Sequence, residues 1–360
     1  MTSIPLNDQR PKRILWIDYA KFIAIFFVIF AHQTLSKSWF NFISGFDLPL
    51  FFFLSGYLFS FKKYDTYKAF LKARVRQLLI PYLILNLVTY FLWLIFFKDF
   101  DPYYYTKEPL YKQFIGIFYG NGIQGYLIHS IASWFIICLF VLENMYFLAF
   151  RKVEGWRKLL ILSGFFVLAI LDHKFIHFRL PWSINVAIVA ILFYAAGNML
   201  KVHIDRFVKL SIPMLIAVFI SSFAVLYYAT HGNYVDMDQH VYYSLKLFYI
   251  GAFSGIICAV SFCRIIELLV GPISVVLYIA QNTLVIIAFH IMLMSLITHL
   301  FAFWMGFSIE DVHGDNLWSF LTAVATLFLC IPLIYVVDKY FPFMVGKPGK
   351  NKIPKRQEQV

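Results

Sequence analysis

Three polar side chains interrupt the first apolar stretch of the sequence, residues 14–34, and their spacing places them on one side of a helix. They are Asp18, Lys21 and His32. Lys21 and His32 are eleven positions apart, which is almost three helical turns and roughly 16 Å along the axis. Asp18 precedes Lys21 by three positions, so these two can form an ion pair. Polar groups are costly to bury in a membrane, and such a line of them indicates a functional site.

His32 has the chemistry of a general base. An imidazole with a pKa near 6.5 can take the proton of a hydroxyl group while that hydroxyl attacks a thioester carbonyl. Lys21 would then either position the residues around His32 or bind an anionic donor that approaches from the cytoplasmic side. The alternative is structural: Asp18 and Lys21 form an ion pair, and His32 is an interfacial imidazole that is satisfied by its neighbours.

The composition indicates a membrane protein. Of the 360 residues, 61% are hydrophobic and only 14% are charged, whereas soluble domains carry about 25% charged residues. The mean hydropathy is +0.74, and the aromatic content of 20% suits lipid-facing surfaces and headgroup belts. The net charge of +12 does not form a basic stripe of the kind that binds nucleic acid. The four cysteines lie in apolar segments and show neither a disulfide framework nor a CxxC metal site.

Ten apolar stretches have the length and composition of transmembrane helices. They are residues 14–34, 47–61, 78–97, 131–150, 159–171, 182–200, 210–230, 241–263, 273–300 and 317–337. The predicted fold is an all-α membrane protein, a bundle of about ten transmembrane helices that forms one domain over residues 1–346. A basic cytoplasmic tail, residues 347–360, follows it. With the N-terminus inside, 23 of the 31 Lys and Arg residues lie on the inner side and six on the outer side. This asymmetry predicts that both termini are cytoplasmic.

The residues around His32 also resemble a known family. The stretch WIDYAKFIA at residues 16–24, followed by His32, resembles the beginning of acyltransferase family three, the membrane O-acyltransferases of bacterial surface glycans. It looks closest to the fucose 4-O-acetylase-like branch. Family members show an Asp, a basic residue, ten intervening residues and a His. Further matches follow in order: LPLFFFLSGY at 48–57, RVRQLLIPY at 74–82, WF at 134–135, the segment 180–197 that begins LPW, and QNTL at 281–284 with His290.

The sequence departs from the family pattern at two positions. Many members have Arg where this chain has Lys21, and Lys keeps the charge but loses the forked geometry. Related sequences often have a His where this chain has Asp47. Asp47 either orients the imidazole of His32 or is an ordinary loop carboxylate.

The resemblance implies that an acetyl (acyl) group passes from cytoplasmic acyl-CoA, with acetyl-CoA as donor, to a hydroxyl of a cell-surface or lipid-linked glycan. It implies a protein of the bacterial inner membrane, in contact with membrane lipid, that needs no metal. The predicted catalytic residues are then His32, Asp18, Lys21 and Asp47.

Candidate donor-binding residues lie on the predicted cytoplasmic side. Lys68, Lys72, Arg74 and Arg76 form a basic cluster that would capture the phosphates of coenzyme A. The alternative is the ordinary positive charge of a cytoplasmic loop. Ser55, with its neighbour Gly56, either lines a tunnel for the pantetheine arm or allows close helix packing.

Candidate acceptor-binding residues are Trp134, His290 and Asn282. Trp134 would stack on a sugar or belong to an aromatic belt, and His290 would line the pocket or be a buried, hydrogen-bonded imidazole. The loops around 99–125, 172–179, 231–240 and 310–315 collect Tyr, His and acidic residues, which suit carbohydrate. Glu143 and Lys246 are further intramembrane charges that can pair.

Two other functions fit a polytopic chain with intramembrane charges. A secondary transporter would commonly show repeated halves with interrupted helices at matching positions, and no such repeat is visible in this sequence. A non-catalytic glycan-assembly protein would keep the fold after losing activity. Asp47 favours this alternative, because it replaces a His that related sequences often have.

Overall fold

The computed structural model describes residues 13–98, 109–123, 125–176, 178–306 and 315–347, and these are almost entirely helical. The predicted all-α class is confirmed. Within the described residues, the strands are β1 (Val235–Asp236) and β2 (Val241–Tyr242), which pair antiparallel. The predicted tail and the acidic loop at 310–315 lie outside the described residues, apart from Lys347 and Asp315.

Long helices follow one another along the chain. The α-helices are α1 (Leu15–Ala31), α2 (Lys37–Ser44), α3 (Asp47–Leu58), α4 (Tyr67–Arg74), α5 (Ile80–Leu92), α6 (Leu110–Tyr119), α7 (Trp134–Phe150), α8 (Arg157–Phe175), α9 (Ile184–Met199), α10 (Lys201–Phe207), α11 (Ile212–Thr230), α12 (Leu245–Val270), α13 (Ser274–Gln281), α14 (Thr283–Met305) and α16 (Asn316–Tyr340). Short 3-10 or π turns join or extend them: η1 (Phe61–Lys63), η2 (Val75–Leu79), η3 (Trp93–Phe97), η4 (Ile128–Ser133), η5 (Pro181–Ser183) and η6 (Pro342–Val345).

Seven helical segments of the described residues are long and apolar enough to cross a membrane. They are Tyr67–Phe97, Ile128–Phe150, Pro181–Met199, Ile212–Thr230, Leu245–Val270, Thr283–Met305 and Asn316–Tyr340. Each overlaps one of the ten predicted spans. The other three predicted spans are also helical, but α1 has 17 residues, α3 has 12, and α8 carries charged residues at both ends. The chain is therefore a multi-pass membrane protein, and the count of ten spans stays a prediction.

The ninth predicted span, 273–300, is not one helix. It divides into α13 and α14 at Asn282, whose backbone angles (φ −121°, ψ 26°) are not helical. The Asn282 side chain donates a hydrogen bond to the carbonyl oxygen of Tyr278 at 2.9 Å. Asn side chains compete in this way with regular helical hydrogen bonding, which explains why apolarity alone did not reveal the break.

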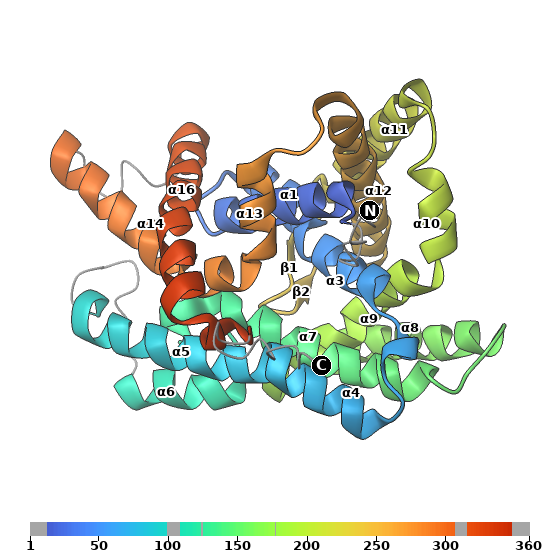
Figure 1. Ribbon diagram of the computed structural model, residues 1–360, viewed down its shortest axis with the longest axis horizontal. Coiled ribbons are helices and arrows are strands. Elements are labelled where there is room, and N and C mark those ends of the chain that lie inside the picture. Colours follow the sequence, from blue (N-terminus) through green and yellow to red (C-terminus); the bar gives the residue numbers. More distant parts are fainter. Residues whose placement is uncertain (1–12, 99–108, 124, 177, 307–314, 348–360) are drawn as a thin grey trace, which may run out of the picture.

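The helices lie in two groups that α3 connects (Figure 1). α4 to α9 occupy the lower half of the view, and α1, α11, α12, α13 and α16 occupy the upper half, with the β1–β2 pair between them. α1 packs against α12, α13 and α3, while α3 packs against α9. α3 therefore packs against elements of both groups.

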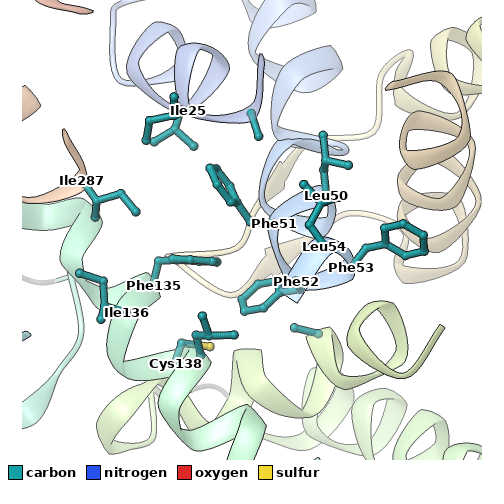
Figure 2. Packing of buried hydrophobic residues seen from close by; sticks show 14 of the residues in the cluster. Ile25, Leu50, Phe51, Phe52, Phe53, Leu54, Phe135, Ile136, Cys138 and Ile287 are labelled. Carbon is teal, nitrogen blue, oxygen red and sulfur yellow. The ribbon is translucent and has the colours of Figure 1, made fainter. Parts of the chain in front are cut away.

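A dense aromatic core fills the region where the two groups meet. Figure 2 shows Phe51 of α3 between Ile25 of α1 and Phe135 of α7, with Ile287 of α14 beside them. The ring centroid of Phe135 lies 5.6 Å from that of Phe51 and 4.8 Å from that of Phe52. Contacts of this kind fix the relative positions of four helices.

Glycines bring α3 and α9 into backbone contact. A Cβ atom at Gly56 would collide with the carbonyl oxygen of Tyr194, and one at Gly197 would collide with that of Phe53. Small residues allow membrane helices to approach this closely. The packing role considered for this part of α3 is therefore confirmed for Gly56.

We expect Gly56→Ala and Gly197→Ala each to destabilise the protein by about 2 kcal/mol or more, because the added methyl group forces the two backbones apart. Gly164→Ala in α8 is the matched control, since a Cβ atom there meets nothing within 4 Å and Ala favours the helix. Thermal unfolding of the detergent-purified variants measures the effect. If all three variants unfold at the wild-type temperature, the contact does not hold α3 against α9.

Candidate active site

His32 ends α1 and lines a cavity. Its Nδ1 lies 2.7 Å from the carbonyl oxygen of Val28, one turn earlier in the same helix. A carbonyl oxygen only accepts, so Nδ1 carries the hydrogen and donates it. Nε2 of the neutral imidazole then keeps its lone pair, which is the form that a general base needs.

His290 lies directly against His32, although 258 positions separate them in the sequence. The two ring centroids are 5.1 Å apart, and the rings are nearly perpendicular at 81°. His290 is fully buried, and its Nδ1 lies 2.8 Å from the carbonyl oxygen of Ile286. Its Nε2 has no hydrogen-bond partner among the described residues. The structure thus brings together the imidazoles of the first and ninth predicted spans.

The cavity beside His32 has a volume of about 380 Å³, which is within the range of small-molecule sites. Asp47 and Trp134 also line it. Three residues that the sequence singled out from separate helices therefore share one cavity. The remaining polar lining comes from Gln33, Thr34, Ser44, Asp236, Asp238 and Gln239.

Asp47 is buried at the first position of α3, and its Oδ1 accepts a hydrogen bond from the backbone N–H of Leu48 at 2.7 Å. A carboxylate in the first turn of a helix is also favoured by the helix dipole. The partner that fixes the Nδ1 of His32 is the Val28 carbonyl rather than Asp47. Asp47 shares the cavity with His32, and the expectation that it orients the imidazole stays a prediction.

Asp18 forms an ion pair with Arg13 rather than the predicted pair with Lys21. Asp18 Oδ2 lies 2.5 Å from Nε of Arg13, and Arg13 also donates to the carbonyl oxygen of Leu277 at 3.0 Å. Lys21 is partly buried nearby. Asp18 thus helps to fasten the beginning of α1 to α13, and the structure does not place it in the His32 cavity.

Arg74 is held inside the protein rather than presented to a ligand. Its Nε lies 2.8 Å from Oε2 of Glu143, and its Nη1 donates to Gln77 at 2.8 Å. Glu143 therefore pairs with Arg74; the sequence had left open a pair with Lys246. Among the other predicted donor contacts, Lys72 and Arg76 are exposed. Ser55 is half-buried beside Gly56 and lies outside the lining of the His32 cavity.

Asn282 lies away from the two histidines. Its Oδ1 accepts a hydrogen bond from Nζ of Lys347 at 2.8 Å, and that ammonium also pairs with Asp338 at 2.6 Å. Asn282 does not line the His32 cavity, and its predicted role in binding the acceptor stays a prediction. Its side chain instead ties the α13–α14 junction to the C-terminal segment.

The basic cluster and the His32 cavity lie at opposite ends of α3. Asp47 begins α3 at the cavity, whereas Tyr57, near its end, packs against Trp16 with ring centroids 5.2 Å apart. Just beyond that end, the Arg74 guanidinium lies 5.8 Å from the ring centroid of Phe59. A helix of 12 residues is roughly 18 Å long. The two predicted substrate-binding regions are therefore separated by the length of that helix.

The comparison with protein families identifies the chemistry. A family model described as an acyltransferase domain matches residues 14–336. The chain belongs to this family. It is acyltransferase family three, as the sequence motifs predicted, and the protein is accordingly a membrane acyltransferase. No curated protein and no solved structure matches the chain.

The acyltransferase has site residues that the sequence did not single out. Asp236, Asp238 and Gln239, in and between β1 and β2, form one wall of the His32 cavity. The sequence showed only that the loop at 231–240 gathers acidic residues and His. Their placement depends on how this segment packs against α2, which periodicity does not reveal.

Burial raises the pKa of Asp238 to about 7; Asp236 contributes to the increase and Arg179 opposes it. A pKa above the ordinary value means that the folded protein binds this proton more tightly than the unfolded chain does. The resulting stabilisation is complete below about pH 4 and is lost as the pH rises through 7. We expect Asp238→Asn to remove this dependence, so the wild-type acyltransferase loses stability relative to the variant between about pH 5 and pH 8.

Thermal unfolding of both proteins across this pH range measures the difference. Asp65→Asn, which alters an exposed carboxylate near α4, is the control and should follow the wild-type profile. Parallel profiles for wild type and Asp238→Asn would show that Asp238 does not titrate in this range.

Proposed function

We propose that this acyltransferase moves an acetyl group from acetyl-CoA, which arrives from the cytoplasm, to a hydroxyl of a cell-surface or lipid-linked glycan. The protein would lie in the bacterial inner membrane with about ten spans and both termini cytoplasmic, as the Lys and Arg distribution favours. The observation that carries the proposal is the His32 cavity. It joins an imidazole with a fixed Nδ1 proton to carboxyl and aromatic groups that suit a sugar.

His32 acts in this reaction as a general base and then as a general acid. Its Nε2 takes the proton of the glycan hydroxyl while the hydroxyl oxygen attacks the carbonyl carbon of the thioester. A C–O bond forms and the C–S bond breaks. The proton held by His32 passes to the departing sulfur of coenzyme A. The products are a glycan ester and a free thiol, and His32 returns to its neutral form.

The hydrogen bond from Nδ1 of His32 to Val28 supports both steps. It keeps the imidazole in one tautomer and orientation, and it stabilises the imidazolium that forms when Nε2 is protonated. His290 packs against this ring and limits its rotation. Asp47 accepts hydrogen bonds from the sugar, and Trp134 offers an apolar face to it; both line the cavity.

The donor binds from the opposite end of α3. Lys72 and Arg76 are exposed there and contact the phosphates of coenzyme A, while Arg74 holds this segment through Glu143. The pantetheine arm lies along the path toward His32. Lys21, which precedes His32 by roughly 16 Å along α1, stands beside that path.

We expect His32→Ala to reduce acyl transfer by about 10²- to 10⁴-fold, because the hydroxyl loses its proton acceptor. His203→Ala is the control, since it removes an exposed imidazole on α10. Mass spectrometry of surface glycans from cells that carry wild type, each variant or no protein measures the acyl group as a mass difference. Wild-type acylation by a normally inserted His32→Ala protein would reject His32 as the base.

The donor-binding proposal has its own test. We expect Lys72→Gln combined with Arg76→Gln to raise the KM for acetyl-CoA by about tenfold with little change in kcat, because charge-assisted contacts to phosphate are lost. Arg157→Gln removes an exposed charge at the start of α8 and should leave the KM unchanged. Kinetics with purified protein and varied acetyl-CoA distinguish these results. An equal KM in wild type and the double variant would place the donor elsewhere.

A further inference from the structure

A second cavity adjoins the one beside His32. It has a volume of about 570 Å³, and Arg179, His240 and Tyr242 line it. Ile131, Asp238 and Gln239 line both cavities, so they form the wall between the two. The two cavities therefore lie next to each other, on either side of these three residues.

Arg179 brings an incompletely paired positive charge to the second cavity. Only 6% of this residue is exposed. Its Nη2 donates to Oγ of Ser183 at 3.2 Å and lies 4.0 Å from Oδ1 of Asp238. Its Nε and Nη1 have no hydrogen-bond partner among the described residues. These two atoms carry three of the five N–H groups of a guanidinium, and donors left unpaired when buried are costly.

The backbone around Arg179 is held firmly in place. The Tyr119 hydroxyl donates to the carbonyl oxygen of Arg179 at 2.7 Å, and Ser183 N donates to Oδ1 of Asn121 at 3.1 Å. Trp182 and Ser183 both adopt left-handed conformations, with φ of 58° and 54°. Non-glycine residues persist in this region only when their surroundings enforce it, and such residues cluster at ligand sites.

The nearby acidic groups leave part of the Arg179 charge available. Asp172 is already engaged, because its Oδ2 lies 2.6 Å from Nε2 of His240 and its Oδ1 accepts a hydrogen bond from Asn185 at 2.6 Å. Asp238 has a pKa raised to about 7 by burial, so near neutral pH a substantial fraction of its carboxyl groups is uncharged. The Tyr242 hydroxyl is a further buried group with no hydrogen-bond partner in the described part of the chain.

We propose that the second cavity binds an anionic group of the acceptor, a carboxylate or a phosphate, through the free N–H groups of Arg179. The planar guanidinium matches these groups with paired hydrogen bonds. This inference rests on the proposed function, and it names the acceptor class: a glycan with a negative charge on the acylated sugar or on its neighbour.

Sugar binding to the purified full-length protein in detergent tests this inference without acyl-CoA. Methyl glucuronide and methyl glucoside form a matched pair that differs in the carboxylate, and glucose 1-phosphate tests the phosphate. Thermal unfolding is followed at constant ionic strength against sodium chloride. We expect an anionic sugar to raise the unfolding temperature of wild type and the neutral glucoside to have a smaller effect. The more effective anion identifies the group.

Variants locate the binding. We expect Arg179→Gln to weaken binding of the anionic sugar by about tenfold to a hundredfold, and Arg179→Lys to restore part of it because Lys keeps the charge without the fork. Lys174→Gln, which removes an exposed charge in α8, should bind as wild type does.

Equal effects of anionic and neutral sugars on wild type would overturn the inference. Unchanged binding by Arg179→Gln would overturn it as well. The comparison of anionic with neutral sugars uses the wild-type protein alone, so the inference can be tested even if a variant misfolds. Charge-selective binding without acyl transfer would instead contradict only the proposed function.

Discussion

The hydrogen bond from Nδ1 of His32 to the carbonyl oxygen of Val28 is the interaction on which the proposed chemistry depends. It is a bond within one helix, so α1 alone determines which nitrogen of the imidazole is free. The surrounding helices then decide what that nitrogen faces. α3 and α7 supply Asp47 and Trp134, α14 supplies His290, and the β1–β2 segment closes the cavity with Asp238. An imidazole fixed within α1 is thus combined with a pocket built by distant segments.

Buried charges elsewhere are paired in ways that keep these segments in position. Arg13 and Asp18 fasten the beginning of α1, Arg74 and Glu143 join α4 to α7, and the carboxylate of Asp172 meets the imidazole of His240 near the second cavity. An unpaired charge in a low-dielectric interior lowers the stability of the folded protein. Removal of one partner from a buried pair is therefore strongly destabilising. Arg179 differs from these residues because most of its donors have no acceptor within the described chain.

The sequence predicted the helical class, because apolar length is a local property, and its motifs predicted the family. Helical spacing also singled out His32, which the structure places beside a cavity. The sequence also selected Asp47, Trp134 and His290, which the fold brings to the same region. It was wrong about the partner of Asp18, since a spacing of three residues permits the pair with Lys21 but cannot exclude Arg13, which lies five positions away. The wall at Asp236 and Asp238 and the second cavity depend on contacts between loops, and no local pattern encodes them.

The distribution of charge gives the proposed reaction a direction. Three carboxyl groups, those of Asp47, Asp236 and Asp238, line the His32 cavity, whereas the exposed side chains of Lys72 and Arg76 lie beyond the other end of α3. The phosphates of coenzyme A are therefore favoured at the basic end, because opposite charges attract. With the phosphates bound there, the uncharged thioester arm is the part of the donor that extends toward His32. Arg179, in the second cavity, would supply the positive charge that an anionic acceptor needs.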